Sequence, residues 1–310
     1  GFANLLGATM LAGAFLLAMG IARMGQLIRF IPVTVVIGFT NGIAVVIFMA
    51  QIKDFFGLRI DNLPAEFFAR IKTLAGAAHT VDLPTLGLAA GCLLFLLSYN
   101  RLAQHLALLR RAPGPLAVLI AGTLVAWLFE LPVETIGSRF NGIPQELPAI
   151  GFPPLSIHDF GKLISPAVTI ALLGAIESLL SARVADSQID DRHDPNQELI
   201  AQGLANLAAP LFGGFAATGA IARTTTNVKT GGRTPIAGIL HALVLLGIVL
   251  VAAPLAAYVP LATLSAIVMV VAVNMGEWHE FTELRRYSNN YRIILLATFF
   301  VTVLFDLTIA

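Results

Sequence analysis

The sequence predicts an all-α protein that crosses a membrane several times. Of its 310 residues, 57% are apolar and only 12% are charged, and the mean hydropathy is +0.84. Soluble domains average about 25% charged residues. The few charges are separated by uncharged stretches about 20 residues long, which is the length of a transmembrane helix. The net charge of +1 gives no case for nucleic-acid binding, and a single cysteine excludes an intrachain disulfide.

Uncharged windows predict four spans in the first half of the chain: 1–22, 32–52, 83–100 and 112–129. The second window contains "GFTNG", whose glycines allow either a bend or close helix packing. Arginine-rich connectors follow the first and third spans, whereas the connectors 53–82 and 131–162 balance or slightly favour acids. Positive charge gathers on the cytoplasmic side of a membrane. We therefore expect the arginine-rich connectors to be cytoplasmic and the other two to lie on the opposite side.

The second half predicts further helices. A fifth span, 163–182, is interrupted only by Glu177, and a sixth covers 199–212. Ahead of the sixth, Asp194 is placed to cap a helix, with Pro195 at its first position and Gln197 completing a capping box. The stretch 234–276 has no aspartate, glutamate, lysine or arginine and is too long for one span, so it is expected to divide at 252–261. A last span begins near Arg292.

The stretch 213–235, "GGFAATGAIARTTTNVKTGGRTP", is too short and too polar to span a membrane. It predicts a half-helix that starts near the bilayer midplane, capped by Thr218 or a neighbouring glycine, with Arg223 one turn in. The helix dipole and free backbone amides would attract an anion there. Those amides belong to Gly219, Ala220, Ile221 and Ala222. The alternative is a bent segment that only packs, with threonines 224–226 bonding back to helix carbonyls.

Glu177 is the second candidate, because a charged side chain in the middle of a span is costly and usually lines a cavity or has a partner. A buried carboxyl there could carry a proton. Ser178 and Ser181 are close to it on the same helix and could add hydroxyl groups. The alternative is a structural ion pair of Glu177 with Arg183 or Arg223. The sequence contains no phosphate-loop, dinucleotide-binding or zinc motif, so neither a cofactor nor a metal is expected.

Four stretches resemble the sulfate permease (SulP) family, also called solute carrier family 26. They are "RMGQLIRFIPVTVVIGFTNGIAVVIFMAQIKDFFG", "LLGAIESLLSARVADS", "NQELIAQGLANLAAPLFGGFAATGAIARTTTNVKTGGRTPIAG" and "VLFDLTIA". The latter half is most similar to bacterial members that carry C4-dicarboxylates. The resemblance implies two inverted repeats of seven helices, divided between a core and a gate domain, with this chain matching about helices four to fourteen. The family's first three helices and its cytoplasmic STAS domain are missing from the sequence, so we expect the native protein to be longer.

The resemblance also implies a division of the chain into domains. Helix four of the core would be 1–31, gate helices five to seven 32–131, an extracellular connector 132–162, core helices eight to eleven 163–254 with the half-helix at 218–230, and gate helices twelve to fourteen 255–310.

Site residues follow from the same resemblance. The family's anion lies between half-helices three and ten, and 220–223 match the tenth. Ala222 stands where prestin has a serine, so one hydroxyl contact is missing. Glu177 and Ser181 stand where bicarbonate carriers bind sodium through an aspartate and a threonine.

The resemblance implies a secondary anion transporter and not an enzyme. We expect a proton-coupled symporter of a dicarboxylate such as fumarate or succinate, working by an elevator-type movement in a bacterial inner membrane. Its partners would be the anion, protons or sodium, membrane lipid and a second copy in a homodimer. The alternatives are a sulfate or bicarbonate transporter, a nucleobase–cation symporter, and a non-transporting module that senses anions.

Overall fold

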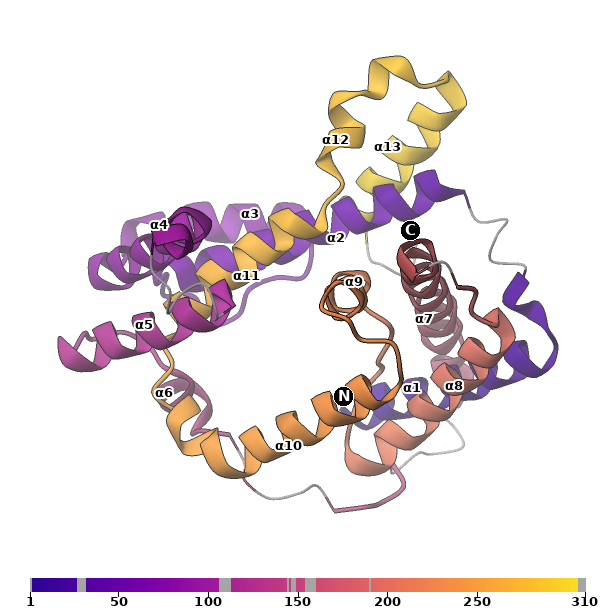
Figure 1. Cartoon of the computed structure of the whole chain (residues 1–310). Helices are drawn as coiled ribbons and strands as arrows, with labels where there is room; N and C mark the ends of the chain where they lie inside the picture. Colours follow the sequence, from indigo (N-terminus) through magenta and orange to yellow (C-terminus); the bar gives the residue numbers. More distant parts are fainter. Residues whose placement is uncertain are drawn as a thin grey trace. The chain divides into compact units, whose positions relative to one another are not determined.

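The computed structural model describes residues 2–26, 32–105, 113–143, 145, 149–153, 160–189 and 191–305. These residues form thirteen α-helices (Figure 1), and their only extended pairing is an isolated bridge between Thr135 and Pro260. The predicted all-α class is therefore confirmed for the described part of the chain.

Four helices in the described residues are long and apolar enough to cross a membrane: α1 (Phe2–Ile21), α2 (Val33–Phe56), α7 (Phe160–Ile189) and α10 (Ile236–Ala256). Shorter apolar stretches occur in α4 (Leu83–His105), α5 (Gly114–Leu128), α11 (Leu261–Met275) and α13 (Asn289–Leu304). The remaining helices are α3 (Phe67–Gly76), α6 (Ile136–Phe140), α8 (Pro195–Ala208), α9 (Ile221–Lys229) and α12 (Trp278–Thr282). The expected division at 252–261 is confirmed by the end of α10 and the start of α11.

Two expectations for α8 need correction. Its 14 residues end at Ala208, and a 3-10 turn covers Ala209–Phe212, so no α-helix runs through to Phe212. Pro210 lies in this turn, and a proline has no N–H to continue an α-helix. The Asp194 cap is confirmed, because its carboxylate accepts hydrogen bonds from the amides of Asn196 (2.8 Å) and Gln197 (3.3 Å). The described contacts include no return bond from the Gln197 side chain, so the cap is one-sided.

The chain divides into two compact units, each made of two separate stretches. The first unit contains residues 1–32 and 146–244, and the second contains 33–145 and 245–310. The border between 244 and 245 falls inside α10. From the sequence we expected borders after residue 31, at 132–162 and after residue 254.

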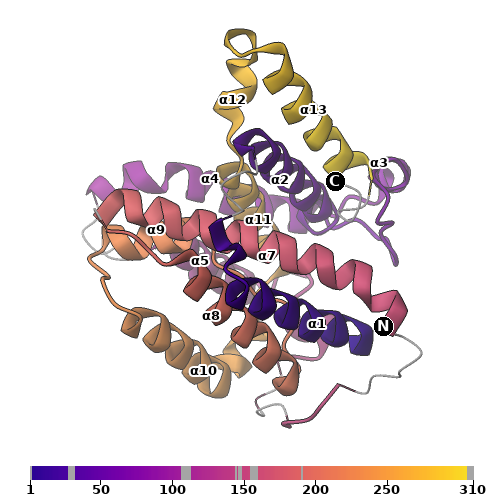
Figure 2. The same cartoon turned by 90° about the vertical axis from the view of Figure 1, so that its right-hand side faces the viewer.

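In the first unit, α1 packs lengthwise against α8 and also contacts α7 (Figure 2). Glycines bring the two backbones together: a Cβ built on Gly13 would lie 2.7 Å from the backbone nitrogen of Leu207, and one on Gly203 would lie 2.6 Å from that of Leu17. Small and branched apolar side chains fill the adjacent core, namely Ala12, Leu16, Ala167, Ala171, Ala175, Leu179 and Leu199.

In the second unit, α2 packs against α11 and α13, and the "GFTNG" motif makes this contact. A Cβ on Gly38 would lie 2.6 Å from the carbonyl oxygen of Leu295, so close packing, and not a bend, explains that glycine. Asn41 is fully buried. Its side-chain oxygen accepts a hydrogen bond from the amide of Glu277 at 2.6 Å, and its nitrogen donates to the Glu277 carbonyl at 3.3 Å. The motif thus fixes both α13 and the end of α11 to α2.

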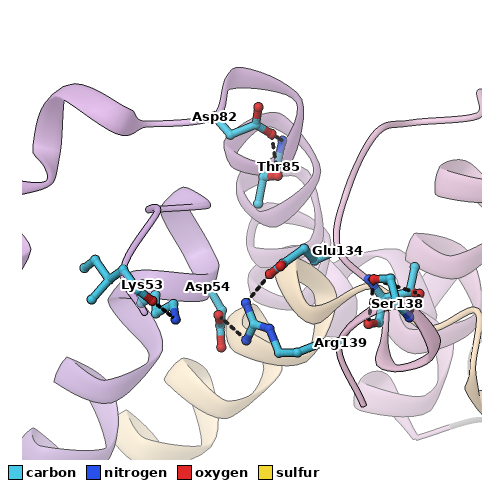
Figure 3. A network of polar contacts seen from close by, with 9 residues as sticks. Lys53, Asp54, Asp82, Thr85, Glu134, Ser138 and Arg139 are labelled. Atoms are coloured by element: carbon cyan, nitrogen blue, oxygen red, sulfur yellow. Dashed lines mark hydrogen bonds and ion pairs between the residues drawn. The ribbon is translucent and has the colours of Figure 1, made fainter. Parts of the chain in front are cut away.

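A charged network fastens the connector that carries α6 (Figure 3). Arg139 donates to Asp54 at the end of α2 (Nη1 to Oδ1, 2.7 Å) and to the carboxylate of Glu134. Thr135 and Ser138 form a reciprocal capping box at the start of α6. The connector is therefore anchored to α2 as well as to the chain that joins α10 and α11.

Candidate functional site

The predicted half-helix exists as α9, but it begins later than expected. Its N-cap is Ala220, whose side chain cannot cap, and its first internal bond runs from the Thr224 amide to the Ala220 carbonyl at 3.0 Å. Thr218 is therefore not the cap. Its hydroxyl instead donates to the carbonyl of Gly174 in α7 at 3.0 Å. An N-cap must directly precede the first helical residue, and Thr218 lies too far upstream.

The start of α9 has three helical amides without acceptors in the described part of the chain, those of Ile221, Ala222 and Arg223. The amides of Gly219 and Ala220, which the sequence also suggested, precede the first helical residue, Ile221. The Arg223 side chain is exposed and makes no ion pair with any described residue. Free amides, the positive end of a helix dipole and a guanidinium therefore gather where α9 begins.

The extended segment before α9 is held by α8. The Asn206 side chain is almost fully buried. It donates to the Ala217 carbonyl and accepts from the Ala217 amide, both at 2.9 Å. Gln202, one turn earlier, also donates to the Ala217 carbonyl. This two-way pairing replaces the ladder that an extended segment would make in a sheet, so the irregular backbone keeps its hydrogen bonds.

Gly219 lies against α7. A Cβ at this position would be 3.3 Å from the Cα of Ser178 and 3.5 Å from the Cβ of Ser181. The first distance is tighter than an ordinary van der Waals contact and the second is ordinary, so a glycine lets the segment pass close to Ser178 of α7.

The predicted serines meet this segment on the same face of α7. Ser181 donates to the Thr224 hydroxyl at 2.8 Å, which ties α7 to the first turn of α9. Ser178 donates to the carboxylate of Glu198 in α8. Ser178 is 1% exposed and Ser181 is 3% exposed, so both hydroxyls depend on these partners. Sequence reasoning missed Glu198, although an acid in the first turn of a helix after a capping aspartate is a visible signal.

Glu177 is partly buried on α7 and has no hydrogen bond or ion pair with any described residue. The described ion pairs do not include the expected alternative, a pair of Glu177 with Arg183 or Arg223, and both arginines are exposed. Glu177 and Arg183 are six positions apart on one helix, about 240° around its axis, so their side chains lie on different faces. The described residues also contain no group of three or more metal-ligating side chains.

A family model described as the sulfate permease family matches residues 1–298. The chain belongs to this family. The candidate sulfate transporter YvdB of Bacillus subtilis is 43% identical over the whole chain and 57% of its own length. The bicarbonate transporter BicA of Synechocystis is 32% identical over 97% of the chain and 52% of its length. The chain thus spans about half the length of these relatives.

Solved structures of the family agree with the fold. The transmembrane domain of a cyanobacterial BicA matches with a TM-score of 0.86 and 29% identity, covering 99% of this chain and 76% of that one. Murine Slc26a9 matches with a TM-score of 0.83 and 20% identity, covering 98% and 49%. The chain is therefore a polytopic, all-α integral membrane protein, and its bacterial relatives point to the plasma membrane. The named members of the family are transporters and not enzymes.

Proposed function

We propose that the chain forms the anion-translocating part of a secondary transporter, with the anion bound at the start of α9. The observation that carries this proposal is the combination of three unpaired amides at Ile221, Ala222 and Arg223 with the exposed guanidinium of Arg223. Small residues before the helix allow a ligand to approach the backbone. The transport functions in the names of YvdB and BicA support the same reading.

The substrate class we propose is a divalent oxyanion. Two negative charges suit a full positive charge together with a helix dipole. Sulfate is the first candidate, because YvdB, the relative with 43% identity, is named for sulfate. A C4-dicarboxylate such as fumarate, which the sequence put first, has the same charge and becomes the second candidate. Bicarbonate carries only one charge and is the third candidate because of BicA. A neutral nucleobase would not need Arg223.

We propose that Glu177 couples transport to protons. It lies on the same helix as Ser178 and Ser181, which reach α8 and α9, and no described cation holds it ionised. A carboxyl in this setting can take up a proton together with an incoming anion, which offsets one of the charges that must cross the bilayer.

The two units suggest how the site would move. We propose that the first unit, which contains α7, α8 and α9, is the core that carries the anion, and that the second unit is the gate. An elevator-type movement of one relative to the other would give alternating access. A homodimer and the STAS domain remain expectations for the full-length protein.

The test is uptake into proteoliposomes that contain the full-length protein, using labelled sulfate, fumarate and bicarbonate with and without an inward proton gradient. We expect sulfate or fumarate uptake to rise with the gradient. Glu177→Gln should reduce it to the rate without a gradient, because glutamine keeps the size but cannot take up a proton. Asp191→Asn, an exposed carboxylate in the connector after α7, is the matched control and should behave like the wild type.

Each other outcome assigns a different function. If transport by the wild type and by Glu177→Gln is equally independent of the proton gradient, Glu177 does not couple transport to protons. Uptake that depends on sodium instead of protons would favour the sodium alternative. If no anion accumulates but anions still bind, the protein is a sensor, and uptake of uracil would identify a nucleobase symporter.

A further inference from the structure

A groove in the second unit lies between α4 and α5 and has no role in the proposed anion site. Its volume is about 480 Å³, and its walls are almost entirely apolar. We define the α4–α5 groove by six of its lining residues, Gly87, Gly91 and Phe95 of α4 and Val118, Gly122 and Val125 of α5. Gly87 and Gly91 open it, because a Cβ at either position would have no atom within 4 Å. None of the described side chains fills this space.

The groove has the length of one lipid leaflet. Its lining runs along α4 from Pro84 to Phe95, and this corresponds to roughly 16 Å of helix. Half of the hydrocarbon core of a bilayer is about 15 Å thick. Leu94 and Leu97, on the same helix, are each 65% exposed, as expected for a helix that faces lipid. An extended acyl chain therefore matches the groove in both length and polarity.

A second, more polar cavity adjoins the groove at Leu131, which lines both. It lies where α5 ends and is lined by Trp127, Glu130, Thr135 and Tyr258. Tryptophan and tyrosine favour the level of the lipid headgroups. Among the described residues, the indole N–H, the phenol O–H and the Glu130 carboxylate have no partner. Two donors and one anionic acceptor without a described partner therefore line this cavity.

The backbone at Glu130 is strained in a way that favours glycine. Its φ is +46°, in the left-handed region, at the turn that ends α5. The amides of Glu130 and Leu131 close this turn on the carbonyls of Trp127 (3.3 Å) and Ala126 (3.0 Å). Glycine or asparagine usually occupies this position in such a turn. A glutamate that keeps its side chain despite this strain points to a role for the carboxylate.

We propose that these two cavities bind one phospholipid with an ammonium headgroup, phosphatidylethanolamine. An acyl chain fills the α4–α5 groove, the Glu130 carboxylate pairs with the ammonium, and Trp127 and Tyr258 donate to the phosphate or ester oxygens and stack beside the cation. Glu130 is the only charged residue among those described that line the polar cavity, so the pocket complements a cation and repels an anionic headgroup.

Native mass spectrometry of the full-length protein tests the proposal. The protein is mixed with phosphatidylethanolamine or phosphatidylglycerol that carry the same acyl chains, and the retained lipid is counted. We expect at least a fivefold preference for phosphatidylethanolamine. Gly91→Leu should reduce retention of both lipids severalfold by filling the groove, whereas Glu130→Gln should remove the preference between them. Gly247→Leu in α10 is the control, because a side chain there also meets no atom within 4 Å.

Three results would overturn the proposal. The first is equal retention of the two lipids by the wild type, and the second is unchanged retention in Gly91→Leu. The third is a shift from dimer to monomer in Gly91→Leu without loss of lipid, which would make the groove an interface between two copies. Gly91→Leu adds a good helix former where there is free space, so misfolding does not explain a loss of lipid.

Discussion

At the scale of single residues, side chains just before helices determine where those helices begin. Asp82 precedes α4, and one of its carboxylate oxygens accepts from the Thr85 amide at 3.0 Å and from the Thr85 hydroxyl at 2.5 Å. These hydrogen bonds lower the pKa of Asp82, and the one from the Thr85 hydroxyl has the larger effect. Asp194 and Ser288 likewise cap α8 and α13, because their side-chain oxygens accept hydrogen bonds from backbone amides. Each cap satisfies an amide that the helix itself leaves free.

We predict that Asp82→Ala lowers the stability of the protein by about 1 kcal/mol at neutral pH, since an alanine cannot cap α4. Because the folded pKa of Asp82 is lowered, its contribution is complete above the unfolded pKa of about 3.9 and is lost as the pH falls through the folded pKa. The gap in stability between variant and wild type should therefore narrow as the pH falls below about 4. Thermal unfolding in detergent across this range measures it.

Asp61→Ala is the control for this experiment. Asp61 is exposed in the same connector and makes no hydrogen bond with any described residue, so its replacement should change stability little at any pH. An equal loss in both variants, or a gap for Asp82→Ala that widens in acid, would contradict the assigned cap.

At the scale of helices, glycine decides which pairs pack closely. Gly13 and Gly203 bring α1 and α8 together, and Gly38 brings α2 against α13. In a lipid environment apolar side chains gain little from leaving the solvent, so close backbone contact and hydrogen bonds hold helices together. Asn41 supplies such bonds between α2 and the end of α11.

We predict that Gly203→Ala destabilises the protein by about 1–3 kcal/mol, because the added Cβ would lie 2.6 Å from the backbone nitrogen of Leu17 and α1 would have to move. Gly247→Ala in α10 meets no atom within 4 Å. It should stabilise slightly, by about 0.5–1 kcal/mol, through helix propensity alone.

The melting temperatures of the two glycine variants in the same detergent provide the measurement. Equal shifts of the same sign would show that α1 and α8 do not depend on this contact. The two substitutions are chemically identical, so their difference isolates packing from propensity.

At the scale of the whole molecule, the chain crosses between its two units three times, so neither unit is a continuous segment. The connectors between helices differ in charge in a way that assigns them to the two sides of the membrane. Asp61 lies in the connector 53–82, which is expected on the side opposite the cytoplasm. Arg192 lies in the connector after α7, and the alternation of connectors along the chain puts that connector on the cytoplasmic side despite its acids. Both residues are exposed.

We predict that Asp61→Cys reacts with a membrane-impermeant maleimide in intact cells, whereas Arg192→Cys reacts only after the membrane is permeabilised. The experiment uses a Cys92→Ser background, since Cys92 is the only cysteine in this sequence and is buried. Labelling with the opposite sidedness would reverse the orientation drawn from the arginine-rich connectors.

The longer helices could be predicted from the sequence alone, because an uncharged apolar run and a capping residue are local properties of the chain. Uncharged runs marked the spans, Asp194 marked the start of α8, and the polar interruption at 213–235 marked the short helix α9. The four stretches that resemble the sulfate permease family were also sufficient to identify the family. The helices α3 and α6 escaped the prediction because they are short, with 10 and 5 residues, and lie in connectors between the uncharged runs.

Only the tertiary structure decided which residues meet. Thr218 reaches Gly174 and not the start of α9, Ser178 reaches Glu198, and Glu177 is left without a described partner. These residues are 20 to 44 positions apart where they pair. A local sequence pattern does not show which residues pair across such a separation in the sequence, since the partner depends on which helices pack and at which turn. The same packing created the α4–α5 groove, whose two open glycines look in the sequence like those that close a helix contact.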